Sequence, residues 1–373
     1  MADWSDIVVP ELAELDQFAL GLTMAEVKDL YGLDEVVKLS WNESLFGPLP
    51  GVFEAVEAEL ENIRLYPEQP YIDFRNEVAA STGTSPGNVV PAHGSLALLG
   101  LVASLLLRPG EHVVVPTLTY GLYAQTSATR GATVHHVPMR GLAIDLGALA
   151  NAARRVDARI AWICDPNNPT GAALEPDEWR RFLDALPERS VAVVDEAYAG
   201  FAPPDRRVRR EPDVVEGRRV IVLRSFSKLY GLAGLRLGYA LVDESLMPYF
   251  DLLEEPFNVN CAALAAGCAC LRATDAVEAR RQEVALARAA LSEGLLAAGL
   301  EPLPSVTNFV LARVDVDDTA LGDRLARRGI LIRPGSDYGL PGYVRITVGP
   351  PALMECVSAE LSDACASLRS QVA

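Results

Sequence analysis

Seven short apolar segments, most of them rich in β-branched residues, constrain the fold of this chain more than any other feature. They lie at residues 89–92, 112–116, 133–138, 160–164, 191–195, 220–224 and 237–242 and alternate with helical or turn-forming segments. Such runs are typical of strands buried on both faces, and crossovers between them favour one doubly wound sheet. We therefore predict a three-layer α/β protein with a mostly parallel, seven-stranded sheet.

The pattern changes near residue 265. Long helices rich in Ala, Leu, Arg and Glu follow, of which residues 276–298 are the clearest, and short strands are expected around 309–313 and 343–348. This part is typical of a smaller α+β domain. We predict three parts: an N-terminal arm with part of the small domain at 1–50, a large domain at 51–264, and the C-terminal small domain at 265–373.

A single lysine, Lys228, stands among hydroxyls and small residues just after the apolar segment at 220–224. A residue at the carboxyl end of such a strand lies where open α/β sheets bind ligands. Ser225 and Ser227 offer hydroxyl donors, and Arg236 offers a planar cation that suits two phosphate oxygens. A solvated lysine between turn-forming glycines would give a similar pattern. The combination is nevertheless what a protein needs to hold an aldehyde cofactor by a Schiff base while binding its phosphate.

Two further segments bring polar groups to the same edge of the sheet. Asp195 ends the segment at 191–195, and a carboxylate beside a cationic ring nitrogen keeps that nitrogen protonated, which makes the ring an electron sink. An Asp in this position is also a common helix cap. Tyr198 could donate to a phenolate oxygen on the same ring. The run 165–171 holds two prolines and a glycine, so this rigid loop can aim the amide of Asn168 at a ligand.

Together these motifs resemble the fold type I, pyridoxal-phosphate-dependent class I/II aminotransferases, and within them the histidinol-phosphate aminotransferase branch. Asn-Pro-Thr-Gly at 168–171, Asp-Glu-Ala-Tyr at 195–198 and Ser-x-Ser-Lys followed by Arg236 carry the resemblance. Further segments in the family's order are 39–48, 65–67, 119–123, 256–260, 307–309 and 345–349. The resemblance extends from about residue 25 to the end of the sequence, and it implies that the large domain binds the cofactor.

The resemblance also implies a role for each cofactor-site residue. Lys228 would form the Schiff base with pyridoxal 5'-phosphate and carry the proton between substrate and cofactor, and Asp195 would pair with the pyridine nitrogen. Tyr198 and Asn168 would bond the ring oxygen, and Tyr120 would stack on the ring face. The phosphate would be bound by the start of a helix, two hydroxyls and a guanidinium, at Gly94, Ser95, Ser225, Ser227 and Arg236.

Substrate residues follow from the resemblance in the same way. Arg345 matches the arginine that binds the substrate α-carboxylate as a bidentate pair, and Asn42 begins a segment that the family places near the substrate. Arg333 lies where the histidinol-phosphate branch uses a second arginine for the substrate phosphate, and Phe18 would replace an N-terminal aromatic residue. Tyr66 resembles a tyrosine that reaches the phosphate site of the neighbouring subunit, which implies a homodimer.

The chain departs from that branch at positions that bear on the substrate. The acidic pair that commonly follows the glycine near the phosphate helix is replaced by Leu96 and Ala97, and Asn-Glu-Asn-Pro is replaced by the run 42–45. Candidate substrates are therefore histidinol phosphate, an aromatic or other neutral amino acid, or a specialised biosynthetic amine. We favour amino transfer between an amino acid and a 2-oxo acid. A pyridoxal-dependent decarboxylase or lyase and a non-catalytic cofactor-binding protein are the alternatives.

Composition argues against several other classes. The net charge of −17 over 373 residues would repel a nucleic-acid backbone, and the longest apolar run, 96–107, is too short to span a bilayer. The first residues are acidic and lack a secretory apolar region, so we expect a cytoplasmic protein. The six cysteines have no disulfide or zinc spacing, and no metal is expected. The arginine-rich run at 202–210 is interpreted as a solvated loop near the mouth of the site.

Overall fold

The computed structural model describes residues 4, 7–12, 15 and 21–372. Its central feature is a sheet with the strand order β2-β8-β7-β6-β5-β3-β4, which confirms the predicted seven-stranded sheet. The strands are β2 Val89–Ala92, β3 His112–Pro116, β4 Thr133–Val137, β5 Ile160–Cys164, β6 Val191–Asp195, β7 Val220–Ser225 and β8 Gly238–Leu241. Only β8 runs antiparallel to its neighbours, so the carboxyl ends of β3 to β7 share one edge.

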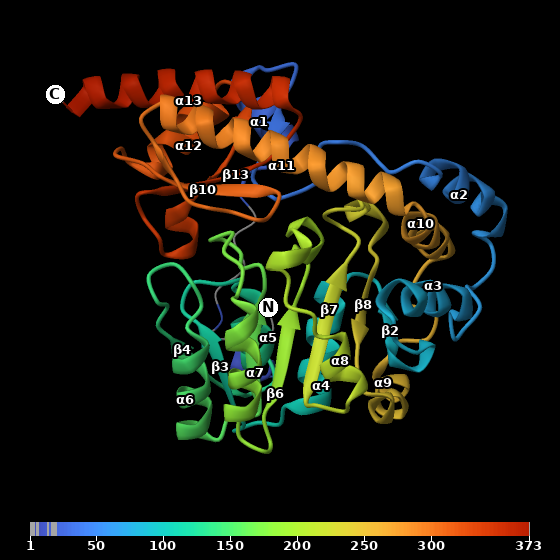
Figure 1. Ribbon diagram of the computed structural model, residues 1–373. Helices are drawn as coiled ribbons and strands as arrows, with labels where there is room; N and C mark the ends of the chain where they lie inside the picture. The colour runs from blue at the N-terminus through green and yellow to red at the C-terminus, as the bar shows by residue number, and fades with distance from the viewer. Residues whose placement is uncertain (1–3, 5–6, 13–14, 16–20, 373) are drawn as a thin grey trace.

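Helices cover both faces of this sheet and give the three predicted layers (Figure 1). One face carries α4 Ser95–Leu106, α5 Leu122–Ala128 and α9 Met247–Leu253. The other carries α3 Ile72–Thr82, α6 Leu146–Val156, α7 Pro176–Ala185, α8 Glu211–Val215 and α10 Cys261–Arg272, with α2 Val52–Ala58 packed on α10. The central strands β5 and β6 are apolar almost to their ends because both of their faces are buried, whereas the edge strand β4 is partly exposed and carries two histidines.

A smaller α+β unit lies beyond the carboxyl ends of β6 and β7 (Figure 1). Its antiparallel sheet has the order β12-β13-β10-β9 and is covered by three helices, and a two-stranded sheet joins β1 to β11. The elements are α1 Met24–Tyr31, β1 Val37–Lys38, α11 Thr274–Ala297, β9 Glu301–Pro302, β10 Phe309–Arg313, α12 Asp318–Ala326, β11 Ile330–Leu331, β12 Arg333–Pro334, β13 Tyr343–Thr347 and α13 Pro351–Val372.

The hydrophobic cores of the two units meet along α11. Val284, Ala287 and Leu291 belong to the core of the small unit, whereas α10 packs into the core of the large one. Val277, near the start of α11, contacts both cores. The domain limits expected from the sequence stay predictions.

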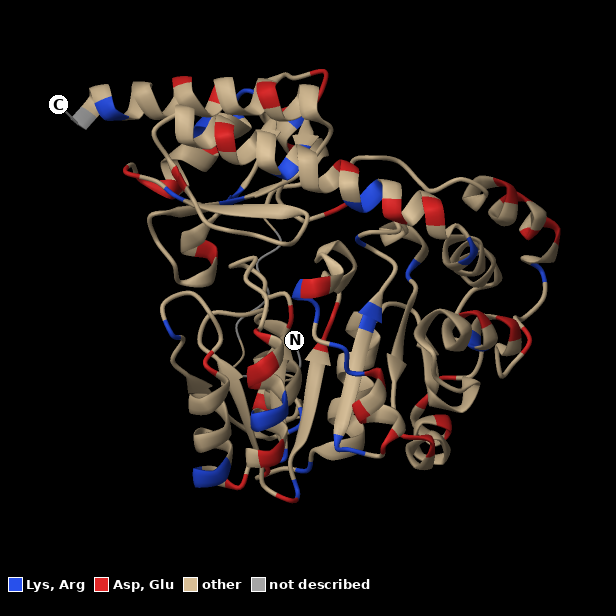
Figure 2. Ribbon diagram, viewed as in Figure 1, with Lys and Arg blue, Asp and Glu red and all other residues tan. Residues whose placement is uncertain are grey.

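Charged residues lie mainly on the outer helices and loops, while the strands are largely uncharged until their ends (Figure 2). The exceptions that matter here are acidic and basic residues at the carboxyl ends of β6 and β7. Among the helices that the structure describes, none has the length and apolar character needed to cross a membrane.

Candidate active site

Lys228 lies three residues after the end of β7, and the carboxyl end of this strand faces the small unit (Figure 1). Its side chain is partly buried, and Nζ donates a hydrogen bond to the carbonyl of Trp41 over 2.9 Å. The same nitrogen lies 5.8 Å from the centre of the Tyr198 ring. Lys228 of the large unit therefore contacts the N-terminal segment around Trp41, which lies 187 positions earlier in the sequence.

The environment lowers the pKa of Lys228 from its ordinary value of 10.5 to about 8. Burial is the main cause, because it disfavours the charged amine, and the positive charges of Arg345 and Arg236 act in the same direction. Glu43 and Asp195 oppose the shift. A substantial fraction of the amine is thus neutral near physiological pH, as a nucleophile or a base requires.

Asp195 is a buried carboxylate at the end of β6. Oδ2 accepts a hydrogen bond from the Tyr123 hydroxyl at 2.9 Å, and Oδ1 accepts one from the backbone N–H of Ala197 at 3.0 Å. Burial raises the pKa of Asp195, while these hydrogen bonds and the charge of Lys228 oppose the rise. The sequence did not single out Tyr123. Its only signal was its place in the run 119–123, one helical turn after Tyr120.

Arg345 joins the small unit to the loop that follows β5. Its Nη1 donates to Oδ1 of Asn168 at 2.5 Å, and its Nη2 donates to the carbonyl of Ser40. Nε is buried and has no hydrogen-bond partner among the described residues. Burial of an arginine with a free donor is unfavourable, so the geometry suits an arriving carboxylate.

Asn42 and Tyr198 lie side by side in the same region. The Asn42 amide donates to the Tyr198 hydroxyl at 3.0 Å, and Asn42 is itself held by Thr347 and Asn308. Burial raises the pKa of Tyr198, which keeps its hydroxyl protonated. The phenol can therefore donate its proton to an oxygen of a bound molecule.

An anion-binding cradle lies where α4 begins. Gly94 caps α4 with a φ of 100°, and a Cβ built on it would lie 2.5 Å from Nη2 of Arg236. A Cβ on Gly238 would lie 2.7 Å from the backbone nitrogen of Ser95. Nη1 of Arg236 also reaches the Ser227 hydroxyl at 3.5 Å. Because Gly94 and Gly238 have no side chains, the N–H groups at the start of α4 and the Arg236 guanidinium can lie close together. This arrangement of donors fits a phosphate.

The remaining expected residues are placed as follows. Tyr120 packs edge-on against Tyr123, with ring centres 5.6 Å apart, and burial raises its pKa to about 12. Ser225 accepts from the N–H of Ser227 at 3.1 Å. Tyr66 is exposed and stacks on Phe257, with ring centres 4.6 Å apart. Phe18 lies outside the described residues.

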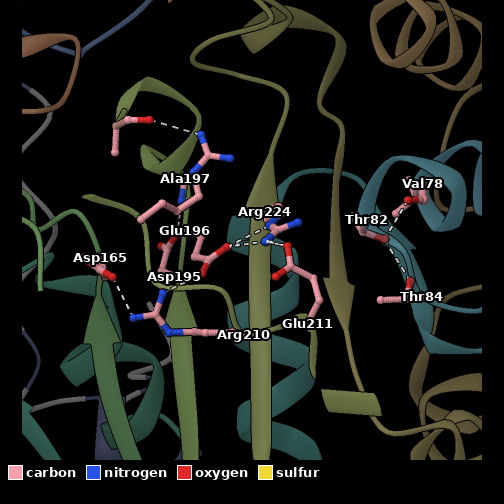
Figure 3. Close-up of polar contacts among 12 residues, drawn as sticks. Val78, Thr82, Thr84, Asp165, Asp195, Glu196, Ala197, Arg210, Glu211 and Arg224 are labelled. Atoms are coloured by element: carbon pink, nitrogen blue, oxygen red, sulfur yellow. Dashed lines mark hydrogen bonds and ion pairs between the residues drawn. The ribbon is translucent and has the colours of Figure 1, made fainter. Parts of the chain in front are cut away.

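The prediction of a solvated loop at 202–210 is wrong for Arg210, which is 1% exposed. Its guanidinium pairs with Asp165 and with Glu196, both at 2.7 Å (Figure 3). Arg224 pairs with Glu196 and with Glu211, also at 2.7 Å each. The physical reason is that Asp165 and Glu196 follow buried strands, and buried carboxylates require compensating cations. That requirement was the sequence signal that could have placed Arg210 inside.

The described residues contain no group of His, Cys, Asp and Glu side chains that could hold a metal ion. An anion cradle next to an amine with a lowered pKa suits a phosphorylated aldehyde instead. Together with the doubly wound sheet, these features define an enzyme that binds pyridoxal 5'-phosphate.

Comparisons with known proteins give the family. The family model for aminotransferase class I and II matches residues 34–360. The histidinol-phosphate aminotransferase 1 of Dechloromonas aromatica is 37% identical over 321 residues, which cover 85% of this chain and 86% of that protein. The histidinol-phosphate aminotransferase of Geobacillus thermodenitrificans is 35% identical over 348 residues, or 92% and 93% of the two chains.

A solved structure agrees over nearly the whole length. The histidinol-phosphate aminotransferase of Sinorhizobium meliloti, in complex with pyridoxal 5'-phosphate, superposes with a TM-score of 0.89 at 30% identity and covers 97% of this chain and 98% of its own. The chain belongs to the class I and II aminotransferases. It is a pyridoxal-phosphate-dependent aminotransferase whose substrates are an amino acid and a 2-oxo acid, as the sequence motifs predicted.

Proposed function

We propose that Lys228 is the catalytic amine of this aminotransferase and that Arg345 binds the substrate α-carboxylate. The observation that carries the proposal is the lowered pKa of Lys228, about 8, at a point flanked by the anion cradle and by Arg345. When bound, pyridoxal 5'-phosphate supplies an electron sink for the charge that develops at the substrate α-carbon. Lys228 would hold the cofactor and, once freed, would remove the substrate's α-proton and deliver it to the cofactor.

The other residues would position the reacting groups. Asp195 would hold a proton on the ring nitrogen, because its buried carboxylate is oriented by Tyr123 and Ala197. Tyr198 and Asn168 would donate to the ring oxygen, and Tyr120 would lie on the ring face. The phosphate would be held by donors at the start of α4 and after β7, namely Gly94, Ser95, Ser225, Ser227 and Arg236.

We also propose that the active unit is a homodimer in which Tyr66 completes the partner's phosphate site. Large apolar side chains are exposed on the segments near Tyr66, and an exposed apolar surface of this kind is typical of an interface. These side chains are Phe53, Leu60, Ile63, Leu65, Ile72 and Phe257. The cytoplasmic location expected from the sequence stays a prediction that cell fractionation would test.

Histidinol phosphate is the second candidate substrate. The relatives quoted above carry its name, and Arg333 lies beside Arg345 on the neighbouring strand, where it would be the cation for the substrate phosphate. The ion pair between Arg333 and Asp337 opposes this candidate, because the carboxylate already compensates the charge of Arg333. Asn42 would line the substrate end of the site, where it is fixed by Thr347 and Asn308.

The experiment that tests the function mixes the purified holoenzyme with a panel of amino acids and with histidinol phosphate, and follows the loss of the cofactor's visible absorption. Transamination predicts a bleached cofactor and a 2-oxo acid or aldehyde product. Release of carbon dioxide without an acceptor would favour the decarboxylase alternative. No change with any amine would contradict the proposal.

A further inference from the structure

Two arginines stand side by side at the substrate end of the site. Arg333 in β12 is the direct cross-strand neighbour of Arg345 in β13. Both guanidinium groups lie near the ring of Tyr338. The Cζ atom is 5.8 Å from the ring centre for Arg333 and 5.2 Å for Arg345. Because Arg345 is the proposed partner of the α-carboxylate, Arg333 is the nearest cation on the same sheet for a second anionic group of a substrate.

The charge of Arg333 is already compensated by Asp337. Oδ2 of Asp337 lies 2.8 Å from Nε of Arg333. The Arg333 side chain is 9% exposed and that of Asp337 is 34% exposed, so the carboxylate lies on the outer side of the pair. A Cβ built on Gly21 would lie 3.2 Å from Nη1 of Arg333, which places the chain near Gly21 against the guanidinium as well.

The loop that carries Asp337 is fixed by a second acidic residue. Asp318, which is buried, accepts hydrogen bonds from the N–H of Ser336 at 2.7 Å and from the N–H of Gly342 at 3.0 Å. It also accepts one from the Ser336 hydroxyl at 3.0 Å. These contacts anchor the backbone on both sides of Asp337. The carboxylate is thus presented to Arg333 by a fixed turn.

A dianionic group that approached Arg333 would meet the negative charge of Asp337 at contact distance. Like charges brought together at a partly desolvated site are unfavourable, and a phosphate that displaced Asp337 from Arg333 would leave this carboxylate without its cation. An uncharged substrate side chain meets neither cost. Specificity of this kind arises from repulsion of the wrong ligand as much as from attraction of the right one.

We propose that Asp337 is a specificity-determining residue that excludes substrates with a distal phosphate and favours α-amino acids with uncharged side chains. This inference rests on the proposed function, because it takes Arg345 as the carboxylate-binding group.

The test compares pairs of substrates that differ only by a phosphate: L-homoserine, L-serine and L-tyrosine with their O-phospho derivatives, and histidinol with histidinol phosphate. The quantity measured is the ratio of kcat/KM for the phosphorylated member to that for the unphosphorylated member. In the wild-type holoenzyme this ratio is expected below one. In Asp337→Asn, which keeps the shape and removes the charge, it should rise at least about tenfold.

Two further variants separate charge from structure. Asp337→Glu keeps the carboxylate, and its ratio should stay close to that of the wild type. Asp315→Asn removes the acidic partner of Arg369 elsewhere on the small unit and should leave the ratio unchanged. A wild-type ratio above one, or an Asp337→Asn ratio that does not rise, would overturn the role of Asp337 while leaving the aminotransferase intact. An enzyme that converts no member of the panel would instead refute the proposed function, and this inference with it.

Discussion

At the scale of single residues, the chemistry depends on an amine that gives up its proton easily. Replacing Lys228 with Ala removes that amine, so the visible absorption of the lysine-bound cofactor should disappear. Amino transfer should fall by a factor of at least about 10² to 10⁴, the usual contribution of a positioned general base. The comparison is Lys28→Ala, because the Lys28 amine lies on the surface and donates to the carbonyl of Asp34. An unchanged spectrum in Lys228→Ala would refute the assignment.

The pKa of Lys228 also predicts a pH dependence. Only the neutral amine attacks an aldehyde, so the rate at which the apoprotein takes up pyridoxal 5'-phosphate should rise about tenfold per pH unit at low pH. It should level off above pH about 8. Because the charge of Arg345 lowers this pKa, Arg345→Met should move the break to higher pH, toward 10.5. Stopped-flow absorbance at a series of pH values measures the uptake rate of the wild type and of Arg345→Met. If both rates level off at the same pH, the charge of Arg345 does not lower the pKa of Lys228.

At the scale of elements, the ion pairs of Arg210 hold together the ends of β5 and β6. Arg210→Met would leave Asp165 and Glu196 buried with less compensation. Loss of one partner from a buried pair costs about 3–5 kcal/mol of folding free energy. The matched variant is Arg189→Met, which breaks largely exposed pairs with Glu111 and Asp157 and should cost about 0–1 kcal/mol. Urea unfolding of the two variants gives the comparison, and equal losses would refute a special role for Arg210.

The same elements show what the sequence could reveal. The seven strands of the large sheet were predictable, because the central ones are buried on both faces and are therefore apolar, and the edge strand β4 still contains two valines. Lys228 and Asp195 were predictable because each follows such a strand. The partners that orient them were not. Tyr123 reaches Asp195 from a helix 72 positions earlier, and a contact of this kind depends on packing and leaves no local pattern. The burial of Arg210 was indicated by the need to compensate buried carboxylates, but the pairing of Arg210 with Asp165 across 45 positions was not.

At the scale of the whole molecule, the proposed dimer predicts how the protein responds to a charge on its apolar surface. Ile63 is 68% exposed and is one of the large apolar side chains near Tyr66 that would form the interface. Ile63→Asp should therefore weaken association and yield monomers. Leu286→Asp is the control, because Leu286 is 72% exposed on α11, outside this group of side chains. Light scattering measures the mass of each variant, and a wild-type monomer would exclude the proposed assembly.

The helix α11 has a consequence for the size of the molecules that fit this enzyme. Phe226, two residues before Lys228, packs into the large core, whereas Val344 and Ile346, on either side of Arg345, pack into the small one. The helix α11 contacts both cores, so it helps to set the span between amine and guanidinium over which a substrate must reach, although it contributes none of the proposed site residues. Changes in its curvature would alter the length of substrate that the enzyme accepts while leaving the chemistry of both anchoring groups intact.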